Sequence, residues 1–105
     1  MSRAEFQRTA EPQLVADVLM YETAEGGRES AALPGWGCLV MVSNTKPWMG
    51  FDALPLLRDE PLSPGQRRRL GFVFLSPDDA LPLMREAGRF YLWEGRIVGE
   101  ADIVR

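Results

Sequence analysis

Residues 63–75 read SPGQRRRLGFVFL. Leu70, Phe72 and Phe74 recur at every second position, which is the period of a β-strand with one buried face. The Pro64-Gly65 pair that precedes the basic triplet is a turn signal, because glycine adopts positive φ without steric cost. This stretch therefore predicts a turn followed by a strand over residues 70–75.

Residues 88–99 read GRFYLWEGRIVG. They predict strands at 89–93 and 96–104, joined by a tight turn at residues 94–95. With Phe90 and Leu92 facing the interior, Tyr91 and Trp93 face outward on the same strand. An outward aromatic pair is a candidate anchor for a partner protein. The alternative is that this outer face packs against the N-terminal arm or against a second copy of the chain.

Three further segments, 13–21, 38–42 and 48–52, have the apolar pattern of short strands. Six short strands with frequent glycine and proline between them favour a barrel or a sandwich. Residues 12–105 are predicted to form this single all-β domain. Residues 1–11 are predicted to be a flexible N-terminal arm, with Phe6 as the side chain that would hold it to the domain.

One short helical turn is predicted near residues 77–86. Ser76 and Pro77 are typical of a helix start, and Asp78-Asp79 would face its positive end. Pro82 soon follows and limits the expected helix to one or two turns. The two aspartates are therefore interpreted as helix-start residues, rather than as a metal or acid/base pair.

The composition excludes several kinds of chemistry. The 105 residues contain no histidine and only one cysteine, so Cys/His zinc sites, disulfides and histidine-activated nucleophiles are excluded. Cys38 lies in an apolar strand and is interpreted as a core residue. We expect no enzyme activity and no cofactor or metal. The absence of a long apolar run or a signal-peptide pattern predicts a cytoplasmic protein that does not bind membranes.

Several motifs follow one another in the order known from one family. They are residues 17–28 (DVLMYETAEGGR), 33–35 (LPG), 64–65 (PG), 88–90 (GRF) and 94–99 (EGRIVG). Over residues 14–104 the chain resembles the third, C-terminal β-barrel domain of elongation factor Tu and related translational GTPases, here as a stand-alone domain. Trp36-Gly37 stands where the family has Tyr-Arg, and Ile97 stands where it has Thr.

The resemblance implies a small six-stranded antiparallel closed barrel. In the full factor this domain contacts the T-arm of aminoacyl-tRNA and packs against the GTPase domain. The resemblance carries tRNA-backbone contacts over to Arg28, Arg89 and Arg96. The chain has no phosphate-binding Gly-x-x-x-x-Gly-Lys-[Ser/Thr] loop, so GTP hydrolysis is not expected.

A basic triplet follows the turn at residues 64–65. Arg67 and Arg69 share one face of the strand and form a candidate phosphate patch, whereas Arg68 takes the other face. The net charge of −3 supplies no general attraction for nucleic acid, and a solvated strand end is the simpler interpretation.

The sequence thus predicts a non-catalytic interaction module that binds a protein partner or self-associates. Its candidate interaction residues are Arg28, Arg67, Arg69, Tyr91, Trp93 and Arg96. The alternative is a weak tRNA- or RNA-binding module that uses the arginines of the glycine-rich loops, with affinity that falls as salt rises. DNA is not an expected partner.

Overall fold

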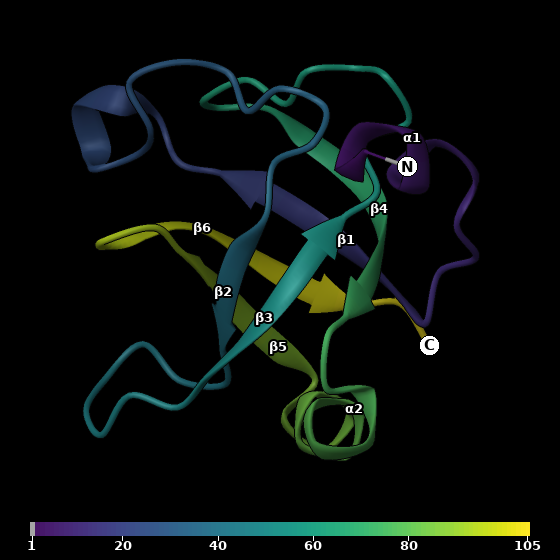
Figure 1. Ribbon diagram of the computed structural model, residues 1–105. Helices are drawn as coiled ribbons and strands as arrows, with labels where there is room; N and C mark the ends of the chain where they lie inside the picture. The colour runs from purple at the N-terminus through teal and green to yellow at the C-terminus, as the bar shows by residue number, and fades with distance from the viewer. Residues whose placement is uncertain (1) are drawn as a thin grey trace.

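The computed structural model describes residues 2–105 and shows how the alternating segments pair: they form a closed antiparallel barrel of six strands (Figure 1). The strands are β1 (Leu14–Met20), β2 (Cys38–Met41), β3 (Gly50–Pro55), β4 (Arg67–Phe74), β5 (Arg89–Trp93) and β6 (Ile97–Ile103). Two helices, α1 (Arg3–Thr9) and α2 (Pro77–Ala87), and a short 3₁₀ turn, η1 (Thr23–Glu25), complete the described elements. The predicted all-β, six-stranded closed barrel is confirmed.

The order of the strands around the barrel is β1-β4-β3-β2-β5-β6, and β6 pairs with β1 to close it. Asp17 on β1 lies opposite Arg69 on β4 and Asp102 on β6. Consecutive strands β5 and β6 form the predicted hairpin, with an irregular register between Leu92 and Trp93. Closure leaves no strand of the barrel with a free hydrogen-bonding edge.

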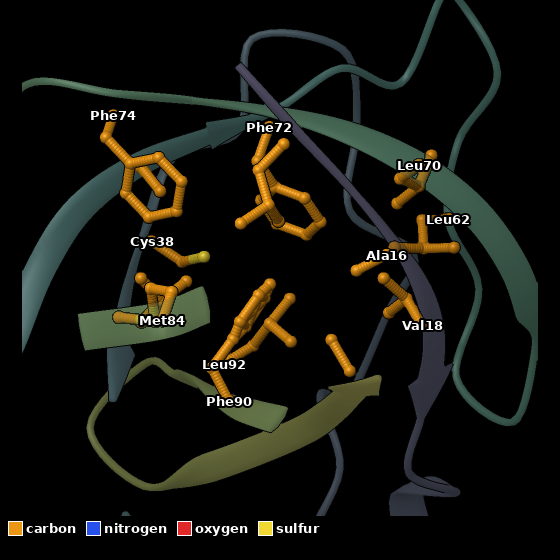
Figure 2. Packing of buried hydrophobic residues seen from close by; sticks show 14 of the residues in the cluster. Ala16, Val18, Cys38, Leu62, Leu70, Phe72, Phe74, Met84, Phe90 and Leu92 are labelled. Atoms are coloured by element: carbon orange, nitrogen blue, oxygen red, sulfur yellow. The ribbon is translucent and has the colours of Figure 1, made fainter. Parts of the chain in front are cut away.

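The core fills the inside of the barrel with the side chains that the period-two pattern placed inward (Figure 2). Phe72 and Phe90 are completely buried, and their rings meet edge to face at 5.1 Å between centroids. Cys38 points into the same core, as predicted. The labelled core side chains in the figure are Ala16, Val18, Cys38, Leu62, Leu70, Phe72, Phe74, Met84, Phe90 and Leu92.

Helix α2 lies across one end of the barrel (Figure 1). It has 11 residues, so it is longer than the predicted one or two turns. Ala80 and Met84, one turn apart, are completely buried, while Pro82 lies inside the helix on its exposed side. The packing of the buried side holds the helix together past the proline. Ser76 precedes the helix as predicted, but its side chain makes no capping hydrogen bond.

Helix α1 occupies most of the segment predicted as an arm, and the sequence pattern did not reveal it. Ser2 and Glu5 form a reciprocal capping box at its start. Gln7, not Phe6, attaches the helix: its side chain is 1% exposed, whereas Phe6 is 37% exposed. Gln7 donates to the Trp36 carbonyl at 2.8 Å and accepts from the Gly35 N–H at 2.7 Å.

Strand β3 lies later in the chain than predicted. It begins at Gly50 and ends at Pro55, so Trp48 and Met49 belong to the preceding loop rather than to the strand. Pro55 is tolerated because it is the last residue of the strand, opposite Phe72 on β4. Strand β4 begins at Arg67, so the whole basic triplet is part of it.

Candidate functional site

The glycine-rich loop at residues 22–31 is fastened to the β5–β6 hairpin by Arg28. Its Nε donates to Glu94 Oε1 at 2.8 Å, and its Nη1 donates to the Ser30 carbonyl at 2.8 Å. The guanidinium also lies 5.4 Å from the centre of the Trp36 ring. Trp36 Nε1 in turn donates to Glu94 Oε2 at 2.8 Å. The Arg28 guanidinium is therefore bound to Glu94, Ser30 and the Trp36 ring of the protein itself.

Arg96 fastens the tip of the same loop. Its Nε donates to the Gly26 carbonyl at 2.7 Å and its Nη2 to the Gly27 carbonyl at 2.8 Å. A side chain at Gly27 would collide with the Tyr21 carbonyl, so only glycine fits there. Arg28 and Arg96 lie together and hold the loop in place, whereas Arg89, the third arginine of the resemblance, lies apart from them on the pair Glu100 and Asp102. A tRNA phosphate would have to compete with these bonds.

The carboxylate of Glu94 is the centre of this cluster. Partial burial raises its pKa, but the hydrogen bonds from Trp36 and Arg28 outweigh that effect, so the pKa lies below the ordinary value of 4.5. Glu94 is thus ionised at neutral pH, and together with Glu29 in the same hollow it balances the charges of Arg28 and Arg96. The corner is therefore a poor attractor for a phosphate backbone.

The basic triplet is divided as the strand period predicted. Arg69 points outward and forms a two-point ion pair with Asp17, at 2.8 and 3.2 Å, and the guanidinium holds the pKa of that carboxyl below its ordinary value. Arg68 takes the opposite face and donates to three carbonyls, those of Leu57, Glu60 and Pro61. Arg67 is exposed, and its side chain makes no hydrogen bond within residues 2–105. The triplet is therefore not a row of three free cations.

Arg67 and Arg69 belong to a larger charged face on the outside of β4, β1, β6 and β5. One row across these strands contains Arg69, Asp17, Asp102 and Arg89 in that order. Arg89 binds Asp102 at 2.8 Å and Glu100 at 3.0 Å. A hollow of about 350 Å³ lies over β4, β1 and β6, and its charged walls carry arginines and carboxylates in nearly equal number. The charged face is therefore close to neutral.

The predicted aromatic pair begins at the edge of the charged face, because Tyr91 lies opposite Glu100 on β6. Tyr91 and Trp93 point outward from β5 and are half-buried, while Phe90 and Leu92 are buried, as predicted. Trp93 lies opposite Leu39 on β2 and contacts Trp48 from the β2–β3 loop at 5.1 Å between ring centroids. The outer aromatic strand is thus partly covered by a loop of the same chain, and the N-terminal helix is elsewhere.

A second apolar area lies beyond Leu39, the residue of β2 that is opposite Trp93. A hollow of about 340 Å³ lies between α1 and the outer sides of β3 and β4, lined by Phe6, Leu54, Val73 and Leu75. Leu75 is 67% exposed and Phe6 37% exposed. A neighbouring hollow connects Leu54 and Leu75 with Leu39. We name the combined surface the apolar face; it consists of Phe6, Leu39, Trp48, Met49, Leu54, Val73, Leu75 and Trp93.

Two side chains with reactive potential are held protonated. Burial is the main cause that raises the pKa of the Cys38 thiol, so it is not a thiolate at neutral pH. Burial, and then the hydrogen bond to Glu100, raise the pKa of Tyr21 to about 12. Within residues 2–105, no three His, Cys, Asp or Glu side chains are grouped as metal ligands. In the same range no helix is long and apolar enough to cross a membrane.

The sequence pattern did not single out Leu75, Val73 and Phe6 as the lining of a hollow on the outer surface. The signal was present for two of them: since Phe72 and Phe74 face inward, Val73 and Leu75 must face outward. Outward apolar residues at consecutive positions of one face indicate that something covers that face. Phe6 had no such signal, because helix α1 was not predicted.

The chain matches no known protein-family model and no curated protein.

Proposed function

We propose that this barrel is a non-catalytic protein-interaction module that binds its partner through the apolar face. The proposal rests on the difference between the charged face and the apolar face of the outer surface. On the charged face, Arg69 is paired with Asp17, and Arg89 is paired with Glu100 and Asp102. On the apolar face, large side chains such as Leu75, Met49 and Trp48 are 67%, 52% and 40% exposed. Exposed apolar side chains gathered on one side are typical of a binding surface.

The resemblance to the third domain of elongation factor Tu is part of this proposal. It is supported by the six-stranded closed barrel together with the order of the motifs along the chain. In our proposal the barrel retains the use of that domain as a docking surface for protein. We also place the protein in the cytoplasm, where a single unpaired thiol such as Cys38 is stable.

RNA binding is the alternative, and it requires guanidiniums that are free to contact phosphates. Arg28, Arg69 and Arg96 each donate to groups of the protein itself. RNA would have to break these contacts, and the net charge of −3 opposes its approach. The protein-interaction function is therefore favoured.

The test is capture of binding partners from lysate of the native cells by the tagged protein, with and without nuclease. The double variant Met49→Ser/Leu75→Ser removes two exposed apolar side chains from the apolar face. Leu83→Ser, on α2, is the matched control because Leu83 is also an exposed leucine but lies outside that face. Sedimentation of the pure protein shows whether the partner is a second copy.

We expect a specific protein that is retained after nuclease treatment, kept by Leu83→Ser and lost with the double variant. Self-association that is abolished by the same double variant would also fit an interaction module. Capture that disappears with nuclease, or that survives the double variant unchanged, would contradict binding through the apolar face.

A further inference from the structure

The hollow beside α1 is built for an apolar side chain. Val73 pairs with Leu54 across β4 and β3, and both are directed to the outside of the barrel. Phe6 on α1 and Leu75 at the end of β4 complete its walls. At about 340 Å³ the hollow is at the small end of the range of ligand pockets. Its lining favours a large aliphatic or aromatic group over a polar one.

Arg3 places a positive charge beside this hollow. It lines the apolar hollow and also the neighbouring one of about 270 Å³, which extends over Gly37 and Leu39 to Asp52. Its Nη1 would lie 3.0 Å from a Cβ at Gly37, so the glycine leaves the space that the guanidinium occupies. Helix α1 and Gly37 together therefore leave room for the guanidinium beside the apolar walls.

The guanidinium of Arg3 has no acceptor in the described part of the chain. Nine of the eleven arginines donate hydrogen bonds to the protein, and Arg3 and Arg67 are the two that do not among residues 2–105. Of these two, only Arg3 adjoins an apolar hollow. Guanidinium donors form strong, two-point hydrogen bonds with carboxylates.

From this arrangement we infer that the groove along α1 binds an acidic, apolar segment of a partner protein. A large apolar side chain of the segment fills the hollow between Phe6 and Leu75, and an adjacent Asp or Glu carboxylate binds Arg3. This inference rests on the proposed function, since it specifies the partner of the same apolar face.

Asp52 sets the orientation of the segment. It is exposed on β3 and lines the second hollow together with Arg3, yet the two make no ion pair. A carboxylate of the partner is attracted towards α1 and repelled from β3. Arg3 and Asp52 therefore have opposite effects on the binding of an acidic segment, which an apolar groove alone would not produce.

The experiment is a selection of random dodecapeptides displayed on phage against the full chain, followed by anisotropy measurements with a labelled synthetic copy of the most enriched peptide. Arg3→Gln and Asp52→Asn change the two opposed charges at exposed positions. Leu75→Ser removes one wall of the hollow, and Leu83→Ser is the control outside the apolar face. The circular dichroism spectrum of each variant confirms that it is folded.

We expect the enriched peptides to combine a large apolar residue with a nearby Asp or Glu. Arg3→Gln should weaken binding by about 5-fold to 20-fold, and Asp52→Asn should strengthen it by roughly 2-fold to 5-fold, since one neutralises an attraction and the other a repulsion. Leu75→Ser should weaken binding at least about tenfold because it removes buried apolar contact. Leu83→Ser should leave the affinity unchanged, and added salt should lower it.

Enriched peptides without acidic residues, or affinity that is insensitive to Arg3→Gln and Asp52→Asn, would overturn the inference while leaving the interaction module intact. Peptides that bind the Leu75→Ser variant as well as the original chain would overturn both the inference and the use of the apolar face. Displacement of the peptide by a second copy of the chain would replace the partner protein with self-association and so also overturn the inference.

Discussion

At the scale of single residues, the guanidiniums of this protein mostly bind its own carbonyls and carboxylates. Arg58 shows the pattern: it donates to the carbonyls of Gln7, Arg8 and Ala10 and thereby satisfies the C-terminal end of α1. Arg96 does the same for the glycine-rich loop. Arginines of this protein therefore fasten loops and helix ends to the barrel.

Arg96→Ala should loosen the glycine-rich loop. Its two hydrogen bonds to Gly26 and Gly27 would be lost, and we expect stability to fall by about 1 kcal/mol, below the usual range for charged hydrogen bonds because the site is partly exposed. Hydrogen exchange should accelerate over residues 22–31. Arg67→Ala is the matched control and should change neither quantity. Equal effects of the two substitutions would show that Arg96 does not hold the loop.

Glu94 makes the stability contributed by its contacts with Arg28 and Trp36 depend on pH. Because the pKa of Glu94 in the folded protein lies below its ordinary value of 4.5, its ion pair and hydrogen bonds contribute fully above that value. The contribution is lost as the pH falls through the folded pKa. Urea unfolding at pH 7 should therefore show the original chain to be more stable than Glu94→Gln, and the difference should shrink towards pH 3. A pH-independent difference would contradict this assignment.

At the scale of elements, the two helices are placed by one buried side each. Helix α2 closes an end of the barrel through Ala80 and Met84, and α1 is attached to the loop at residues 33–37 through Gln7. Neither helix depends on a long amphipathic pattern, and the shorter one was not predicted. The sequence pattern predicts such elements poorly, because a helix of seven residues is not stable by itself and forms only when it packs on the rest of the protein.

Gln7→Ala should detach α1. The Gly35 N–H and the Trp36 carbonyl would lose their partners, and leaving such groups unsatisfied costs about 1–3 kcal/mol. Thr9→Ala, at an exposed position of the same helix, is the control and should not lower stability. Urea unfolding measures the difference, and amide exchange over residues 3–9 reports the helix directly. A stable α1 in the Gln7→Ala variant would refute this account of its attachment.

Pro82→Ala should stabilise α2. Pro82 is exposed inside the helix and cannot donate to the carbonyl four residues earlier. Alanine restores that hydrogen bond, and the gain is partly offset by a more flexible unfolded chain, so we expect about 1–2 kcal/mol of added stability. Pro77→Ala, at the first helical position where proline is favourable, should give no such gain. A loss of stability with Pro82→Ala would mean that the ring makes a contact worth more than the helix bond.

At the scale of the whole molecule, closure of the barrel creates the core and separates the outer surface into two sides. Inward side chains of all six strands meet inside, so the core is shared by the whole ring (Figure 2). The outside then consists of the charged face over β1, β6 and the first halves of β4 and β5, and the apolar face over α1, β2, β3 and the ends of β4 and β5. Our proposal places binding on the apolar face because its large side chains, such as those of Leu75 and Met49, are exposed to solvent.

Phe72→Ala should abolish cooperative folding or reduce it strongly. Phe72 is completely buried and packs edge to face on Phe90 across the barrel, and truncation of such a ring costs about 3–5 kcal/mol. That is a large part of the total stability of a small domain. Phe6→Ala, at the surface, is the control and should leave the thermal transition nearly unchanged. Thermal unfolding followed by circular dichroism checks both variants.

The inward faces of the strands could be predicted from the sequence because a period of two is a local property of the chain. Leu70, Phe72 and Phe74, and likewise Phe90 and Leu92, face the core as that period required. The pattern was compatible with either a barrel or a sandwich. Only the resemblance predicted the closed barrel, which the structure confirms.

The tertiary structure decided which surface groups are free. Glu94 meets Arg28 across 66 positions of sequence, and Asp17 meets Arg69 across 52, so no local pattern reveals that these charges are paired. In the same way, the hollow beside α1 exists only because α1 is folded against β3 and β4, which brings Phe6 to Leu75. Side-chain pairing and surface hollows depend on contacts between distant segments, and these are set by the closure of the barrel rather than by any one stretch of the chain.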